Sequence, residues 1–145
     1  MRVRATIDLP VGPEEAWRCL LDWERQPAWM RDADRVRVLT PHRQGSGVRI
    51  AVRTRVLGIP LLVDVLEVVA WDPPRRLVLA HTRLVRGSGE WRLEPLGSRT
   101  RFVWTERLSV PIPVLGELAL LAYRPFMRWL MRRSLAALQK GFQRN

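Results

Sequence analysis

The sequence has few of the side chains on which metal and cofactor chemistry depends. Its 145 residues include one cysteine, Cys19, and two histidines, His42 and His81. A single cysteine excludes an intrachain disulfide and a cysteine-based metal cluster, and neither histidine belongs to an HExxH motif. A glycine-rich phosphate loop is missing as well. We therefore expect neither a metal nor a cofactor, and we expect Cys19 to be a small core residue.

Acidic residues and lysine are also scarce, which makes the chain strongly basic. Lysine and arginine together number 25, only Lys140 being lysine, against 14 aspartates and glutamates, for a net charge of +11. Such a charge attracts anionic membranes, RNA or acidic proteins. The strand arginines share the side opposite the apolar residues: Arg2, Arg4, Arg35, Arg37, Arg49, Arg53, Arg55, Arg101 and Arg107. That face has almost no aromatic residues for base stacking, which argues against nucleic acid and leaves a solvated face or an anionic membrane surface.

The N-terminus lacks the charged segment and apolar block of a secretory signal, because Arg2 and Arg4 alternate with apolar residues. Together with the single cysteine, this leads us to expect a cytoplasmic protein. A chain of 145 residues is typical of one domain. We expect residues 1–145 to form that domain.

Residues 114–142 are the most apolar stretch, and they have helical periodicity. A straight helix of this length would measure about 43 Å, and Pro125 predicts a kink in it. Arginines at positions 124, 128, 132 and 133 argue against a membrane span. A helical wheel predicts that most of the helix is buried, through Leu115, Ala119, Ala122, Phe126, Leu130 and Ala137.

The rest of the chain predicts one strand, two short helices and six more strands. Residues 2–9 alternate in polarity, and Pro13 opens a short helix that ends near Asp22. The alternation resumes at Asp34, and we interpret residues 86–88 as a hairpin turn. Both faces of residues 61–71 are apolar, so the sequence does not decide which alternate side chains of this strand point toward the interior. The fold class is α+β: a seven-stranded curved antiparallel sheet wrapped around a long kinked C-terminal helix.

Polar residues that share the apolar face of the sheet are the candidate site residues. Glu106 alternates in phase with Phe102 and Trp104, and helical phase makes Arg133 its candidate partner, in what can also be a purely structural ion pair. Glu106, His81 and Tyr123 are the candidates for moving protons, although no catalytic triad can be assembled. The predicted ligand cavity consists of Val52, Thr54, Trp91, Trp104, Glu106, Phe126, Leu130 and Arg133.

Several motifs together resemble the START-like superfamily of helix-grip domains, also known as the polyketide cyclase/dehydrase and lipid-transport family. They are VGPEEAW at residues 11–17, LLDW at 20–23, PAWM at 27–30, DPPRRL at 72–77 and GSRTRFVW at 97–104. None of these motifs is a catalytic signature. The resemblance implies a sheet that grips the C-terminal helix, with an apolar cavity between them for lipids, sterols, hormones, polyketides or quinone tails.

Three functions are compatible with these observations. The first is a binding or carrier domain for a small hydrophobic ligand. The second is an enzyme of the polyketide cyclase, aromatase or dehydratase type that acts on a ligand in the same cavity. The third is an RNA- or membrane-associated regulatory module that uses the basic outer face. The identity of the ligand, the presence of catalysis and the oligomeric state stay open.

Overall fold

The computed structural model describes residues 1–56, 59–83, 86–110 and 112–143. Its elements, in order, are β1 (Arg2–Leu9), α1 (Pro13–Leu20), η1 (Trp23–Ala28), β2 (Ala33–Val38), β3 (Arg49–Val56), β4 (Ile59–Asp72), β5 (Arg76–Thr82), β6 (Arg86–Leu96), β7 (Arg99–Ser109) and α2 (Leu115–Gln143). The seven strands form one antiparallel sheet in the order β1-β7-β6-β5-β4-β3-β2. The predicted α+β fold is confirmed.

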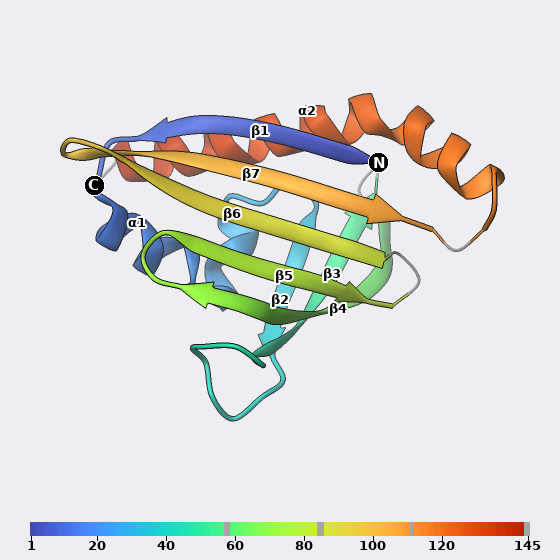
Figure 1. The fold of residues 1–145 in the computed structure, drawn as a ribbon, viewed down its shortest axis with the longest axis horizontal. Coiled ribbons are helices and arrows are strands. Elements are labelled where there is room, and N and C mark those ends of the chain that lie inside the picture. Colours follow the sequence, from blue (N-terminus) through green and yellow to red (C-terminus); the bar gives the residue numbers. More distant parts are fainter. Residues whose placement is uncertain (57–58, 84–85, 111, 144–145) are drawn as a thin grey trace.

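The sheet curls, and α2 closes it (Figure 1). Strands β2 and β3 cross steeply behind β5, β6 and β7, while α2 runs along β1 and β7. Two polar contacts attach the helix to both edges of the sheet. The side-chain amide of Gln139 donates to the carbonyl of Asp8 in β1 (2.9 Å), and the Ser134 hydroxyl accepts from the backbone N–H of Arg31, just before β2 (2.9 Å).

The two short helices pack inside one end of the curl. Helix α1 begins with Pro13 and carries Glu14 and Glu15 in its first turn, where carboxylates favour the helix dipole. It buries Ala16 and Leu20, four residues apart on one face. Cys19 lies off that face and is exposed, so the prediction of a core cysteine is wrong.

A bulge in β4 decides the phase that the sequence left open. Leu66 and Val68 are buried, but the register shifts between Val68 and Ala70. Beyond the shift, Trp71 lies opposite the buried Leu77 and packs edge-on against Trp17, with ring centroids 5.2 Å apart. The inner face therefore changes from even to odd positions within one strand.

Helix α2 is continuous through Pro125, and its axis bends in the N-terminal half (Figure 1). In its N-terminal half only Gly116 and Leu120 are buried, whereas its C-terminal half packs against the sheet through Met131, Ser134, Leu135 and Leu138. The N-terminal half extends past the end of β7 (Figure 1), and Leu115 is 70% exposed.

The prediction that most of α2 is buried is thus wrong. The helical wheel assigned one buried side to the whole of α2, although its two halves have different surroundings. The predicted buried positions therefore differ from the observed ones by about one residue. Leu115, Ala119 and Ala122 are exposed, while Phe126, Leu130 and Ala137 are only half-buried. Within the described residues, no helix combines the length and the apolar character needed to span a bilayer.

Candidate functional site

A cavity of about 120 Å³ lies between α2, the η1–β2 segment and the inner face of the sheet. Trp91, Trp104 and Leu79 wall it on the sheet side, and Met127 and Leu130 wall it on the helix side. Its remaining lining residues are Gln26, Met30, Asp32, Ile50, Val52, Thr54, Asp64, Leu66, His81, Gly89, Glu106, Met131 and Ser134. A largely apolar wall therefore surrounds several ionisable groups.

His81 joins two carboxylates on the cavity floor. Its Nδ1 lies 2.6 Å from Oδ2 of Asp64, and its Nε2 lies 3.3 Å from Oε2 of Glu106. Burial alone would lower the pKa of His81, but the hydrogen bonds to Asp64 and Glu106 raise that pKa to about 9. At neutral pH the ring is therefore an imidazolium that donates from both nitrogens. The indole Nε1 of Trp104 donates to the other Glu106 oxygen, Oε1, at 2.8 Å.

Two glycines in β6 make this contact possible. His81 is on β5 and Glu106 is on β7, with β6 between them, and the residues paired with them on β6 are Gly87 and Gly89. A Cβ atom on Gly89 would lie 2.6 Å from Oε1 of Glu106. Gly87 has a φ of +128°, and a Cβ there would overlap the carbonyl oxygen of Arg107. The inner face of β6 is bare at this point, so side chains of β5 and β7 meet across it.

The sequence contained a signal for this feature that we interpreted differently. We predicted a turn at residues 86–88, but β6 begins at Arg86, so both glycines are inside a strand. Residues 84 and 85 lie outside the described residues. Glycines two apart in an alternating pattern indicate a close approach on one face of a strand.

Asp32 is a further acidic group at the cavity, and the sequence analysis missed it. It lies in the turn before β2, where its carbonyl accepts from the backbone N–H of Arg55 (2.7 Å). Burial, with a smaller contribution from the negative charge of Glu106, raises the pKa of Asp32. Burial likewise raises the pKa of Tyr123, and the charge of Asp32 adds to it. Because Asp32 is in a turn, periodicity did not point to it.

The structure brings together most of the residues predicted to line the cavity. Those that line it are Val52, Thr54, Trp91, Trp104, Glu106 and Leu130, and His81, predicted as a candidate for moving protons, lines it as well. Tyr123, Phe126 and Arg133 are not part of the lining. Phe126 packs instead between Tyr123 and Trp129, with centroid distances of 5.4 and 5.8 Å.

The predicted pair of Glu106 and Arg133 does not form. Arg133 is exposed, and its guanidinium carbon lies 5.1 Å from the ring centroid of Trp129. Two residues of α-helix rotate a side chain by about 200°, so Arg133 points away from the buried Met131. His81 provides the positive charge for Glu106, and the cavity is more polar than predicted.

Three tryptophans form the aromatic part of the core beside the cavity. The rings of Trp91 and Trp104 have centroids 6.5 Å apart, and Trp29 lies 5.8 and 6.2 Å from them. All three are buried. Among the residues that the structure describes, no three His, Cys, Asp or Glu side chains are arranged to hold a metal ion.

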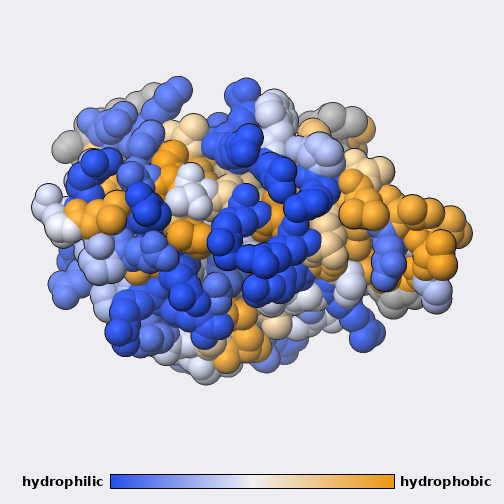
Figure 2. All heavy atoms as spheres, turned by 45° about the horizontal axis from the view of Figure 1, so that its top comes forward, coloured by the Kyte–Doolittle hydropathy of each residue, from blue (hydrophilic) through white to orange (hydrophobic). Residues whose placement is uncertain are grey.

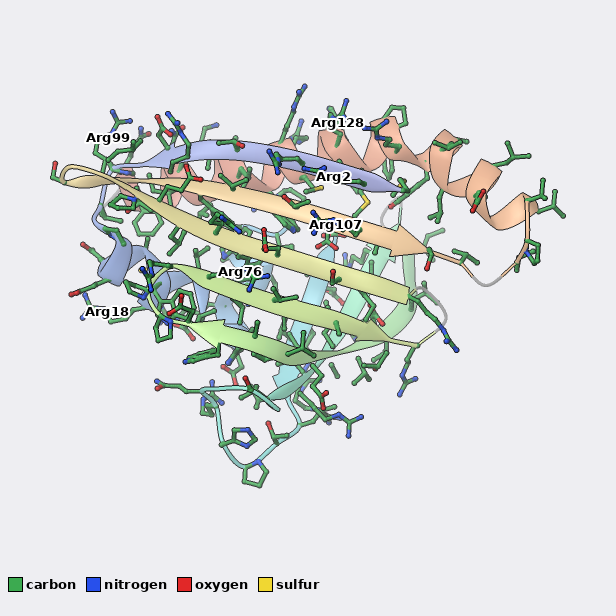
Figure 3. All side chains as sticks on the ribbon, viewed as in Figure 1. Arg2, Arg18, Arg76, Arg99, Arg107 and Arg128 are labelled. Carbon is green, nitrogen blue, oxygen red and sulfur yellow. The ribbon has the colours of Figure 1, made fainter. Side chains whose placement is uncertain are left out.

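The outer face of the sheet is rich in arginine but partly neutralised. A broad groove of about 1080 Å³ crosses it, lined by Arg4, Arg76, Arg92, Arg99, Arg101 and Arg107 with Asp8, Glu90 and Glu94. Side chains of Arg2, Arg76 and Arg107 lie along this face (Figure 3). Arg76 pairs with Glu90 (2.8 Å) and Arg101 with Asp8 (3.3 Å), while Arg53 and Arg55 pair with Asp34. This interleaving of charges is typical of a solvated face.

Known proteins resemble this chain in sequence and in fold. The sequence profile of a family described as polyketide cyclase/dehydrase and lipid transport matches residues 1–143. An uncharacterized protein of Mycobacterium tuberculosis is 28% identical over 142 residues, covering 94% of this chain and 81% of that protein. A START superfamily protein from Mycobacterium smegmatis superposes with a TM-score of 0.77 at 16% identity, over 99% and 97% of the two chains. The Zhui aromatase/cyclase from Streptomyces sp. R1128 gives 0.70 at 17% identity, over 98% and 90%.

Proposed function

The chain belongs to the polyketide cyclase/dehydrase and lipid transport family, and on this premise we propose that its cavity binds a small organic ligand, largely apolar, with one polar end. The ligand's apolar part packs against Trp91, Trp104 and Leu130, and its polar end contacts the His81 cluster. Residues 1–145 act as one domain in this proposal, and the exposed thiol of Cys19 suits a reducing compartment such as the cytoplasm.

The single observation that carries the proposal is the cluster of Asp64, His81 and Glu106, which is largely shielded from solvent and lies beside an open space. Apolar residues of similar volume can often replace a whole buried ion pair without loss of stability, so a fold does not need such a cluster in its core. Ionisable groups of this kind that face a cavity therefore mark a candidate binding site. The wall of tryptophans around them favours a flat or aliphatic partner.

The size of the cavity limits what it can hold. A dry cavity of about 150 Å³ holds a benzene molecule, so about 120 Å³ suits a single ring or a short alkyl chain. A longer ligand requires movement of α2, which has Met127 and Leu130 on the cavity wall.

The hydrogen bonds of the cluster also limit the polar end of the ligand. Both ring nitrogens of His81 and the indole N–H of Trp104 already donate to carboxylates. What remains toward the cavity is mainly acceptor capacity on Asp64 and Glu106. The polar end that fits is thus a hydrogen-bond donor, such as a phenol or another hydroxyl, and a carboxylate is excluded by charge.

Matched ring compounds test the proposal. We expect phenol to shift the NMR signal of the Trp104 indole N–H saturably, anisole to do so more weakly and benzoate not at all. Glu106→Gln should weaken phenol binding, whereas Arg101→Gln, on the outer face, should not. If none of the three compounds moves the Trp104 signal, the cavity is not a site for such ligands and the proposal is wrong.

A cyclase-type enzyme is the second candidate, and the presence of several carboxyl groups around one cavity favours it. Closing a ring on a polyketone needs a base that removes a proton next to a carbonyl and an acid that protonates the receiving oxygen. Glu106 or Asp64 can accept the first proton, and Asp32, whose pKa is raised, can supply the second. If the protein is such an enzyme, we expect it to catalyse exchange of the α-protons of a β-keto thioester with deuterated water. Glu106→Gln and Asp64→Asn should abolish this exchange, and Arg101→Gln should not. A carrier protein would leave the rate of α-proton exchange the same as in buffer without protein.

A further inference from the structure

The N-terminal half of α2 exposes a large apolar surface. Leu115, Leu118 and Leu121 are 70%, 58% and 56% exposed, and Trp129 is 51% exposed. Ile112 and Val114, just before the helix, continue this surface. Figure 2 shows it as the hydrophobic projection at the end of the molecule where α2 extends beyond the sheet. We call Leu115, Leu118, Leu121 and Trp129 the apolar lip. Contiguous exposed surface of this kind marks an interaction site.

The apolar lip is a continuous stripe along the outer side of α2. Leu115, Leu118 and Trp129, together with Ala122 and Pro125, are spaced three or four residues apart, which places them on one side of the helix. The buried Leu120 and Met131 lie on the opposite side. The outer stripe therefore contributes nothing to the packing of the helix on the sheet.

Unpaired arginines border the apolar lip. They are Arg124, Arg128, Arg132 and Arg133, and among the described residues none of the four lies within ion-pair distance of a carboxylate. Glu117 is the only acidic residue of α2. Arg128 points away from the sheet (Figure 3), and Arg133 stacks on Trp129. On the outer face of the sheet, by contrast with α2, the arginines are interleaved with acidic residues.

We propose that the apolar lip docks on the surface of a membrane that contains anionic lipids. The leucines and Trp129 enter the boundary between headgroups and acyl chains, and the bordering arginines contact lipid phosphates. A helix with Leu and Trp on one face and arginines beside them has the composition of an interfacial helix. The apolar area supplies most of the binding free energy, and the arginines favour anionic over neutral lipid.

The charge distribution favours a membrane over a second copy of the chain. Two apolar lips placed face to face would bring eight unpaired arginines together, in a chain whose net charge is already +11. Like charges at a desolvated interface oppose association, whereas anionic headgroups complement the same arginines. Docking would also bring lipid close to the segment that holds Met127 and Leu130 on the cavity wall.

Vesicle co-sedimentation of the full chain tests the proposal without any cavity ligand. We expect binding to vesicles of phosphatidylcholine mixed with phosphatidylglycerol and weak binding to phosphatidylcholine alone. Leu118→Glu and Leu121→Glu should each weaken binding at least about tenfold, because each removes one leucine that the proposed docking buries in the membrane. The matched control is Leu39→Glu, which changes another exposed leucine, located directly after β2 and outside α2, and should bind as wild type.

An arginine pair and an environment-sensitive dye provide independent readouts. Arg124→Gln/Arg128→Gln should lose the preference for anionic vesicles, whereas Arg18→Gln/Arg37→Gln, with the same charge change elsewhere, should keep it. In a Cys19→Ser background, the dye NBD on Leu121→Cys should shift to the blue on vesicle binding, and NBD on Leu39→Cys should not. The dye therefore reports on membrane contact without a glutamate in α2, which could itself repel anionic lipid.

Three outcomes would overturn the proposal. The first is that wild type does not bind anionic vesicles. The second is binding that persists in Leu118→Glu but is lost in Arg18→Gln/Arg37→Gln, which would move the contact to another basic surface. The third is concentration-dependent dimerisation, abolished by Leu118→Glu, without vesicle binding, which would make the apolar lip an interface between copies. None of these results bears on whether the cavity binds phenols.

Discussion

Nε2 of His81 lies 3.3 Å from Oε2 of Glu106, although β5 and β7, which carry these residues, are not neighbours in the sheet. Gly87 and Gly89 of the intervening β6 leave the space in which they meet. The contact places a positive charge and two carboxylates at the floor of the cavity.

The stability of the protein should depend on pH through His81. Its pKa is about 9 in the folded state and 6.5 when unfolded, so the bridge stabilises the fold fully below about pH 6.5, and the contribution is lost as pH rises through 9. The loss is on the order of 3 kcal/mol. Urea unfolding at pH 6 and pH 10 should show this loss in wild type and in His42→Gln, which changes the exposed loop histidine, but not in His81→Gln. Equal pH dependence in all three proteins would mean that His81 is not bridged.

Gly89→Ala should disrupt the cluster with little effect on the rest of the sheet. The added Cβ would lie 2.6 Å from Oε1 of Glu106, so the carboxylate must move away from Trp104 and His81. We expect the pKa of His81, measured by NMR titration, to fall and the protein to lose about 1–3 kcal/mol of stability. Gly141→Ala is the control, since its Cβ meets no atom within 4 Å in a helix and should be neutral or slightly stabilising. An unchanged His81 titration in Gly89→Ala would contradict the proposed role of the bare β6 face.

Leucines of α2 should differ sharply in their contribution to stability. Leu135 is 1% exposed and Leu118 is 58% exposed. Leu135→Ala should therefore destabilise the fold by about 2–5 kcal/mol, while Leu118→Ala should change stability by no more than about 0.5 kcal/mol. Thermal unfolding measures both. Comparable losses would show that the N-terminal half of the helix is packed against the sheet after all.

Glu106 should be coupled to His81 and independent of Arg133. A double-mutant cycle with His81→Gln and Glu106→Gln should give an interaction free energy above about 0.5 kcal/mol, because the side chains are in contact. The same cycle with Arg133→Gln and Glu106→Gln should be additive, since Arg133 is exposed and stacks on Trp129. The reverse result would restore the pairing that helical phase suggested.

Local patterns in the sequence determined the elements and their order. Alternating polarity predicted the strands, Pro13 followed by two glutamates predicted α1, and the 29 residues of α2 had a recognisable helical period. These features depend on neighbours along the chain, so periodicity and capping reveal them. The inward positions of Trp91, Trp104, Glu106 and His81 follow from the same alternation, which explains why those cavity residues were predicted.

Tertiary structure decided which of these residues meet. The β4 bulge changed the inward phase between Val68 and Trp71, and the end of the sheet left half of α2 uncovered. Asp32 reached the cavity from a turn, where no periodicity exists. His81 and Glu106 came together because the alignment of three strands places Gly87 and Gly89 between them. Contacts of this kind depend on register, curvature and the extent of the sheet, which arise from packing of distant segments and leave no periodic trace in the sequence.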